Sequence, residues 1–293
     1  MVLCGALLVG CPSDDPPGSD WLAPPSDPTP GLDATAVEQG ALDALDALLA
    51  VDADTVWDIW SDLAARADDG CPAFSSYAAA ENVHVRGWQT TCTSADGVTF
   101  AGLGAEVLWD GYLTDELVVD GWSVRLDGEV RDAVRGLRST GGALRSVYAD
   151  HVEFPFWLRT WEGGGVHSGG DDLQITLQWQ AVRALPVDAR YVVLDGSVSG
   201  LSGPMDAAAF TALTMLDDTL AGDCAGEPAG TLSLREAESG AWWDIVFHGR
   251  READESVEIS QCDGCGDAWY QGARQGQVCV DARALLEWNT TPW

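Results

Sequence analysis

Lysine is absent from this chain, and its 15 basic residues, all arginine, stand against 47 aspartate and glutamate residues. The formal net charge is −32 at pH 7 over 293 residues. A surface this acidic repels nucleic acid backbones and anionic lipid headgroups, which argues against nucleic acid as a partner. The simplest interpretation of the acidity is solubility, with salt adaptation as a second reason. Binding of divalent cations is the more specific alternative.

The first ten residues carry no charge, and they lead into the run Leu8-Val9-Gly10-Cys11. Small residues before a cysteine are typical of lipoprotein cleavage sites, so we predict a signal peptide over residues 1–10 and lipidation of Cys11. The segment is short for an export signal and has no basic start, so we expect the true start upstream. Pro12 is, by resemblance to bacterial lipoproteins, compatible with the outer membrane or cell surface. The alternative is a mildly apolar N-terminus with an incidental cysteine.

Residues 11–33 hold few large apolar side chains and much proline and aspartate. Seven of the 13 prolines fall between Pro12 and Pro30, and only Trp21 and Leu22 are large and apolar. Such a segment cannot bury enough surface to fold, so it predicts a disordered acidic linker. No later run of 18 or more apolar residues occurs, so the lipid would be the only membrane attachment.

Residues 34–70 show helical spacing of apolar residues and predict a helical hairpin. Thr35 and Glu38 match a capping box, in which a hydroxyl and a carboxylate satisfy exposed amides at the helix start. A second helix is expected from Asp54 to about Gly70. The stripe expected to face the core in the first helix consists of Val37, Ala41, Leu42, Leu45, Leu48 and Leu49.

Residues 71–293 predict a mainly β, antiparallel region, arranged as a sandwich or a meander. The clearest strand spans 173–182, where apolar residues alternate with glutamine and threonine. Similar alternation occurs over 122–126, 191–194, 231–235 and 243–247. Residues 205–221 are ambiguous and favour a strand at their centre, and a division of the region near residue 203 is left open. Turns are expected at six Asp-Gly pairs, which begin at Asp96, Asp110, Asp120, Asp127, Asp195 and Asp263.

Eight cysteines are present; Cys4 lies in the predicted signal and Cys11 would carry lipid. The remaining six are an even number in an oxidising compartment, which predicts three disulfides. Cys71 and Cys92 form the natural local pair. The last four should pair among themselves, Cys224 with one of Cys262 or Cys265 and Cys279 with the other.

The segment Cys262-Asp-Gly-Cys265 also allows a structural zinc site. Two thiolates two residues apart can hold one tetrahedral ion, and Cys224 and Cys279 could supply the other ligands. Export disfavours free thiolates, so disulfides are the favoured prediction over zinc. Redox catalysis is the least favoured, because no βαβ unit surrounds the pair.

The C-terminal motifs carry a resemblance. They are the segments Glu227–Glu236 and Trp242–Phe247, then Cys262-Asp-Gly-Cys-Gly266 and Gly276-Gln-Val-Cys279-Val-Asp281. Together with the signal and linker, they resemble acidic surface lipoproteins of high-GC Gram-negative bacteria. The resemblance covers roughly the last 90 residues. It implies export and lipid anchoring, and it says nothing about an activity.

Catalytic motifs are lacking. The four histidines, His84, His151, His167 and His248, lie far apart in the sequence without zinc-ligand spacing. Gly196-Ser-Val-Ser-Gly200 resembles a nucleophile elbow but has valine where serine is required. A calcium loop beginning at Asp52 fails at its turn glycine. Catalysis is therefore not predicted.

A binding role is better supported by the sequence. Trp157 and Trp161 lie four residues apart, so on a strand they share a face, and exposed tryptophans beside polar residues suit sugar rings. Core packing is the favoured alternative for this pair. Two functions therefore go forward. The first is a membrane-anchored envelope lipoprotein with a structural or binding role. The second is a carbohydrate-binding or carbohydrate-cleaving surface protein.

Overall fold

The computed structural model describes residues 30, 33–50, 70–71, 73–95, 97–113, 117–132, 136–151, 156–162, 165–168, 173–184, 189–217, 224, 226–250 and 262–289. The predicted signal peptide, nearly all of the linker and the second predicted helix lie outside these residues. The description that follows therefore concerns one helix, the sheet and the short helix after it.

Helix α1 (Ala34–Ala50) begins one residue before the predicted capping box. The N–H of Ala36 donates to Oδ1 of Asp33 at 3.0 Å, so Asp33 is the capping residue and the prediction of a box at Thr35 and Glu38 is wrong. An aspartate just before the first helical residue satisfies an exposed amide without help from a glutamate. The predicted apolar stripe is largely confirmed, since Val37, Ala41, Leu45 and Leu48 are buried.

The strands confirm the predicted mainly β, antiparallel fold class. Every strand pairing among the described residues is antiparallel, and all fifteen of these strands belong to one sheet. The strands are β1 (Phe74–Ala80), β2 (Val83–Thr93), β3 (Val98–Leu113), β4 (Leu117–Asp132), β5 (Leu137–Thr140), β6 (Ala143–His151), β7 (Phe156–Glu162), β8 (Gly165–Ser168), β9 (Leu173–Ala184), β10 (Ala189–Ser199), β11 (Met205–Asp217), β12 (Pro228–Glu236), β13 (Trp242–His248), β14 (Cys265–Tyr270) and β15 (Ala273–Cys279).

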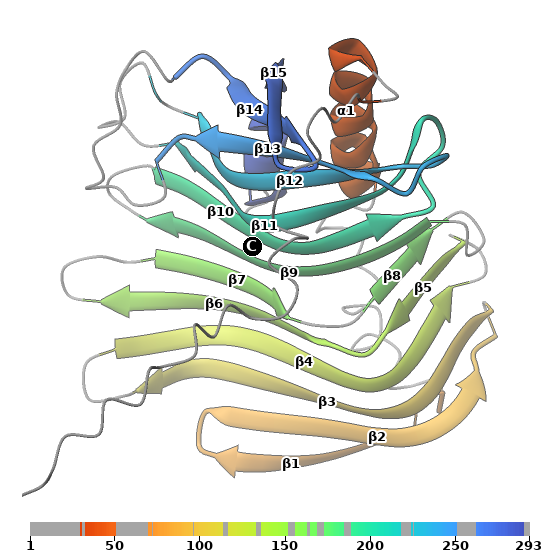
Figure 1. Ribbon diagram of the computed structural model, residues 1–293. Coiled ribbons are helices and arrows are strands. Elements are labelled where there is room, and N and C mark those ends of the chain that lie inside the picture. Colours follow the sequence, from red (N-terminus) through yellow and green to blue (C-terminus); the bar gives the residue numbers. More distant parts are fainter. Residues whose placement is uncertain are drawn as a thin grey trace, which may run out of the picture.

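The order of the strands across the sheet follows their order along the chain from β1 to β4 and again from β9 to β15. Figure 1 shows them stacked from β1 at the bottom to β15 at the top, with α1 beside the last strands. Between β4 and β9 the sheet runs along two parallel paths. On one path β5 pairs with one end of β4 and β8 pairs with β5 and β9. On the other path β6 pairs with the other end of β4 and β7 pairs with β6 and β9. Of the arrangements that the sequence left open, the structure shows the meander. Residue 203 lies between β10 and β11, and the paired sheet continues past it.

Four of the six Asp-Gly pairs expected to form turns lie inside strands. The turn at Gly97 is as predicted, and its N–H donates to the carbonyl of Ser94 at 3.0 Å. The expected turn at Asp195-Gly196 is wrong, because these residues form an irregularity inside β10. There Oδ1 of Asp195 accepts the N–H of Ala212 from β11 at 2.7 Å. A glycine at a bulge bends the strand and does not end it. The pairs that begin at Asp110, Asp120 and Asp127 likewise lie inside β3 and β4.

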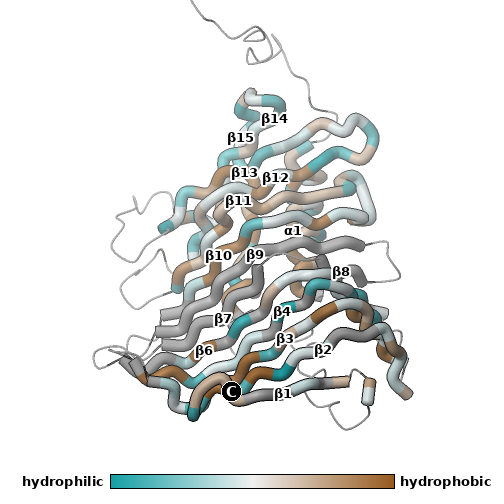
Figure 2. The backbone as a smooth tube through the Cα atoms, turned by 90° about the horizontal axis from the view of Figure 1, so that it is seen from below, coloured by the Kyte–Doolittle hydropathy of each residue, from teal (hydrophilic) through white to brown (hydrophobic). Residues whose placement is uncertain are grey.

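The sheet has a core face and an outer face. Alternate residues point to opposite faces, and Figure 2 shows hydrophobic and hydrophilic residues following one another along the strands. Helix α1 contacts β10, β11, β12 and β15, and the 3-10 helix η5 (Arg283–Asn289) contacts β9, β10 and β11. The core face carries one cluster of buried side chains, among them Trp88, Phe100, Val130, Leu194, Phe210, Leu232, Leu234, Trp243, Ile245, Phe247 and Tyr270.

Three disulfides brace the sheet, and the pairing predicted from the sequence is confirmed. Cys71 bonds to Cys92, Cys224 to Cys262 and Cys265 to Cys279, at sequence separations of 21, 38 and 14. The last pair joins directly opposite residues of β14 and β15. One disulfide therefore holds the N-terminal end of the sheet and two hold the C-terminal end.

Candidate functional site

The tryptophan pair singled out in the sequence lies in β7. The register places Trp161 opposite Leu144 on one side and Trp179 on the other. The same row continues to Leu194, which is fully buried on the core face. Directly opposite residues share a face of an antiparallel sheet, so the register puts Trp161 on the same face as Leu194. The side chains of Trp157 and Trp161 lie outside the described residues, so the choice between core packing and a ligand platform stays a prediction.

A different tryptophan is exposed on the outer face. Trp242 is 39 % exposed, whereas its neighbour Trp243 is 2 % exposed and packs against Tyr270 with ring centroids 5.0 Å apart. The register puts Trp242 opposite Arg235 of β12. The guanidinium carbon of Arg235 lies 6.0 Å from the centre of the Trp242 ring.

Paired polar side chains surround Trp242. Arg235 donates from Nε and Nη2 to the two carboxylate oxygens of Asp206, at 2.7 and 2.9 Å. The hydroxyl of Ser233 donates to Oδ1 of Asp244 at 2.6 Å. We call the set Asp206, Ser233, Arg235, Trp242, Asp244 and Trp269 the outer tryptophan surface.

A second polar group continues the outer face toward the sheet edge. Arg274 donates from Nη2 to Oδ1 of Asp267 at 2.7 Å, and Nε2 of His248 lies 3.4 Å from Oδ2 of the same carboxylate. The hydrogen bond from Arg274 lowers the pKa of Asp267, and His248 adds to this effect. On the other side, the hydrogen bond to Asp206 raises the pKa of Arg235. Both shifts favour the charged form, of Asp267 in one pair and of Arg235 in the other.

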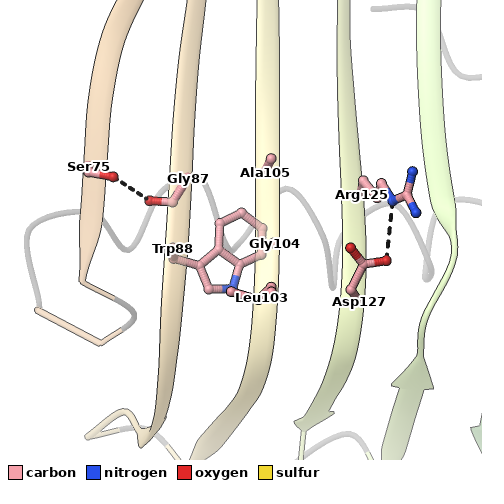
Figure 3. Close-up of a pocket in the computed structure, with 8 residues that line it drawn as sticks. All are labelled: Ser75, Gly87, Trp88, Leu103, Gly104, Ala105, Arg125 and Asp127. Carbon is pink, nitrogen blue, oxygen red and sulfur yellow. Dashed lines mark hydrogen bonds and ion pairs between the residues drawn. The ribbon is translucent and has the colours of Figure 1, made fainter.

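A shallow groove of about 320 Å³ lies further along the sheet, across β1 to β4. Its floor is made of small residues in one row, Ser75, Gly87 and Ala105, and its sides include Leu103 and the ion pair of Arg125 with Asp127 (Figure 3). The groove exists because Gly87 and Ala105 fill little space. Its exposed apolar side chain is an aliphatic one, Leu103, at 46 % exposed.

A cleft of about 400 Å³ lies beside the two C-terminal disulfides. Both carboxylate oxygens of Glu227 accept the N–H of Gly264, at 3.1 and 2.9 Å. Burial raises the pKa of Glu227, and the neighbouring Asp263 adds to the rise, while the Gly264 hydrogen bond and Arg283 oppose it. The acidic lining has a local structural explanation, since Glu227 fixes the loop before β14.

The next observations concern metal binding and membrane attachment. Within the described part of the chain, no three histidine, cysteine, aspartate or glutamate side chains lie close enough together to hold a metal ion. The four sulfurs considered for zinc, those of Cys224, Cys262, Cys265 and Cys279, are joined in two disulfides.

None of the helices in the described residues is long and apolar enough to cross a membrane. Cys11 lies outside these residues.

Comparison of the chain with protein-family models, with curated proteins and with solved structures finds no match in any of the three. The site is therefore built from this chain's own geometry. Sequence reasoning missed Trp242 because it took residues 243–247 as a strand and passed over the residue before them. The signal was present in the alternation, which places Trp242 with Asp244 and His248 on the polar face.

Proposed function

We propose that this protein is a lipoprotein of a Gram-negative cell envelope, anchored through a lipid on Cys11, with a structural or binding role. Residues 11–33 would act as an acidic linker between the membrane and the sheet. This localisation, at the outer membrane or cell surface, follows from the cleavage-site pattern and from the resemblance of the C-terminal motifs. The partners would be the membrane through its lipid, and an envelope protein or glycan.

The observation that carries the proposal is the complete pairing of the six cysteines from Cys71 to Cys279. Structural disulfides form and persist in oxidising compartments, so three of them support an exported protein. Each of the three joins two of these six cysteines, so none of them occupies the thiol of Cys11.

A binding role is supported by the outer face of the sheet. Its charged side chains are held in fixed pairs, Asp206 with Arg235 and Asp267 with Arg274, on strands hydrogen-bonded to their neighbours. Rigid strands position side chains more accurately than loops do. Carbohydrate binding is the second candidate function, and the exposed ring of Trp242 is the observation that favours it.

Metabolic labelling with a fatty acid in the native host tests the anchoring. We expect label on the natural protein and none on Cys11→Ala. Cys4→Ala, a change inside the predicted signal peptide, is the matched control and should keep the label. A mature protein that begins at Met1, or label retained by Cys11→Ala, would refute the proposal.

The zinc alternative has its own measurement. The proposal includes no cofactor, and it expects the purified, unreduced Cys11→Ala protein to show no reactive thiol among the six cysteines from Cys71 to Cys279. Reduction should expose six thiols. One bound zinc per chain, together with four thiols that react after chelation without reduction, would favour the metal site at Cys224, Cys262, Cys265 and Cys279.

A further inference from the structure

We propose that the outer tryptophan surface binds a neutral saccharide, whose apolar face stacks on Trp242 while its hydroxyl groups bond to Asp206, Arg235 and Asp244. This inference rests on the proposed binding role and names its ligand class. It assigns the ligand to β11–β14 and not to the tryptophans of β7.

Exposure of a large flat ring on a rigid strand is the first argument. Trp242 begins β13, which is paired with β12 on one side and with β14 on the other. An indole left 39 % exposed forgoes part of the free energy that its burial would supply. The guanidinium of Arg235 lies over the ring and is itself fixed by Asp206. A ligand therefore meets an aromatic surface whose orientation is already set.

Local charge is the second argument. The chain as a whole carries −32, yet each arginine of this region is paired with a carboxylate, Arg235 with Asp206 and Arg274 with Asp267. A polyanion meets two obstacles, because the net charge of the molecule repels it and both arginines already bond to carboxylates. A neutral ligand that donates and accepts hydrogen bonds meets neither obstacle.

The hydrogen-bonding capacity around the ring is the third argument. A carboxylate offers about four acceptor positions, and Oδ1 of Asp244 accepts the Ser233 hydroxyl while Asp206 accepts two bonds from Arg235. Both carboxylates retain capacity for ligand hydroxyl groups. A planar apolar ring flanked by fixed polar groups matches a sugar, which has an apolar C–H face and a polar edge.

A second aromatic side chain extends the surface. Trp269 of β14 lies directly opposite Asp244, two positions beyond Trp242, so the two tryptophans are diagonal neighbours on the outer face. Diagonal residues across a strand pair are about 7–8 Å apart, within reach of large rings. Two rings in this relation favour an oligosaccharide over a single sugar. The groove at Leu103 is lined by one tryptophan, Trp88, which is buried, so its exposed apolar side chain is aliphatic and Leu103→Ala offers a control.

The test is a glycan array that carries neutral glucan, mannan and galactan oligosaccharides beside uronic acid and sulfated ones, probed with full-length Cys11→Ala protein. Calorimetric titration of the best neutral ligand then compares variants. We expect binding to neutral glycans, a loss of affinity of about tenfold or more in Trp242→Ala, and no change in Leu103→Ala. Circular dichroism and thiol counts verify that each variant is folded.

Three outcomes would overturn the inference: no neutral glycan bound, a preference for acidic glycans, or a Trp242→Ala variant that binds as well as its parent. The protein used carries no lipid, so the result is independent of anchoring. Fatty-acid labelling of Cys11 combined with no glycan binding would remove this inference and leave the proposed localisation intact. Glycan binding without labelling would support this inference and refute the proposed lipid anchoring.

Discussion

The N-terminal strands β1–β4 and the C-terminal strands β11–β15 belong to one sheet and are stabilised differently. Each region buries a carboxylate on the core face that accepts the indole N–H of a tryptophan. In the N-terminal region Glu106 accepts from Trp122 and is also paired with Arg86. In the C-terminal region Glu236 accepts from Trp243 at 2.9 Å and from the hydroxyl of Ser239. Besides the indole, the carboxylate therefore binds an arginine in the N-terminal region and a serine hydroxyl in the C-terminal region.

Surface apolar residues show a second difference between the regions. Leu103, Leu108, Tyr112 and Val118 are exposed on β3 and β4, whereas Trp242 is the only large exposed apolar residue of the described C-terminal strands. Helices α1 and η5 and two disulfides cover and join the C-terminal strands. The C-terminal end of the meander is thus covered by helices and joined by two disulfides, whereas the N-terminal end has one disulfide and a partly buried ion pair.

The largest expected effect comes from the disulfides. Replacing both Cys224 and Cys262 by serine should lower the free energy of unfolding by about 4 kcal/mol, because this pair closes the longest loop. The same change at Cys71 and Cys92, which close a shorter loop, should cost about 3 kcal/mol. Denaturant unfolding of the two double variants measures both values. A smaller loss for the C-terminal pair would contradict the comparison.

The buried carboxylates give the next effect. Glu106→Gln should cost about 2–3 kcal/mol, because the Arg86 guanidinium, whose side chain is only 29 % exposed, loses its charged partner. Glu236→Gln should cost about 1 kcal/mol, because Trp243 and Ser239 are neutral donors whose hydrogen bonds an amide oxygen can also accept. Urea unfolding of both variants compares them. Equal losses would show that the ion pair contributes no more than the hydroxyl.

Two glycines on neighbouring strands of the N-terminal region, Gly104 and Gly87, differ in the space that a side chain would have. A Cβ added at Gly104 would lie 1.8 Å from Cζ2 of Trp88, so Gly104→Ala should destabilise by about 1–3 kcal/mol. A Cβ added at Gly87 meets only a carbonyl oxygen at 3.7 Å, so Gly87→Ala should change stability by less than about 0.5 kcal/mol. Thermal unfolding separates the two. A stable Gly104→Ala variant would mean that the Trp88 ring has room to move.

The smallest effect is a pH dependence of opposite sign at two C-terminal carboxylates. The raised pKa of Glu227 means that folding favours its protonated form, so its contribution to stability is full below its ordinary value of 4.5 and is lost as pH rises. The lowered pKa of Asp267 gives a contribution present above 3.8 and lost as pH falls.

Unfolding curves from pH 3 to pH 7 measure both signs. Relative to the parent, Glu227→Gln should become more stable as pH rises, and Asp267→Asn should become less stable. Arg274→Ala is the control for the second variant, because the Arg274 hydrogen bond is the main cause of the lowered Asp267 pKa. Parallel curves for the parent and both variants would contradict the assigned causes.

Much of the fold could be predicted because the sequence alternates clearly. The strand expected at residues 173–182 lies in β9, and the pairing of Cys71 with Cys92 follows from their closeness along the chain. The Asp-Gly pairs misled for a physical reason. Glycine permits positive φ in a turn and also in a bulge, and at Gly196 it serves the bulge. Local sequence does not distinguish these uses, because the difference lies in the partner strand.

The candidate site was harder to predict than the fold. Trp161 and Trp242 both lie on strands, and only the register shows that the row of Trp161 leads to buried Leu194 while Trp242 pairs with Arg235. The contact between Arg235 and Asp206 joins residues that are 29 positions apart. Alternation assigns a residue to one of two faces, but the choice of which face is covered depends on α1 and η5.

The sequential order of the meander has a consequence for how the protein is made. Most strands pair with the next strand along the chain, and the exceptions, β4 with β6, β5 with β8 and β7 with β9, are only two or three strands apart. Most contacts therefore form between segments that are close along the chain. A polypeptide that emerges with its N-terminus first can add one strand after another to a growing edge, without waiting for distant partners. Cys71 and Cys92 can be oxidised early in this process, whereas the bonds at Cys262 and Cys279 must wait for the last strands to arrive.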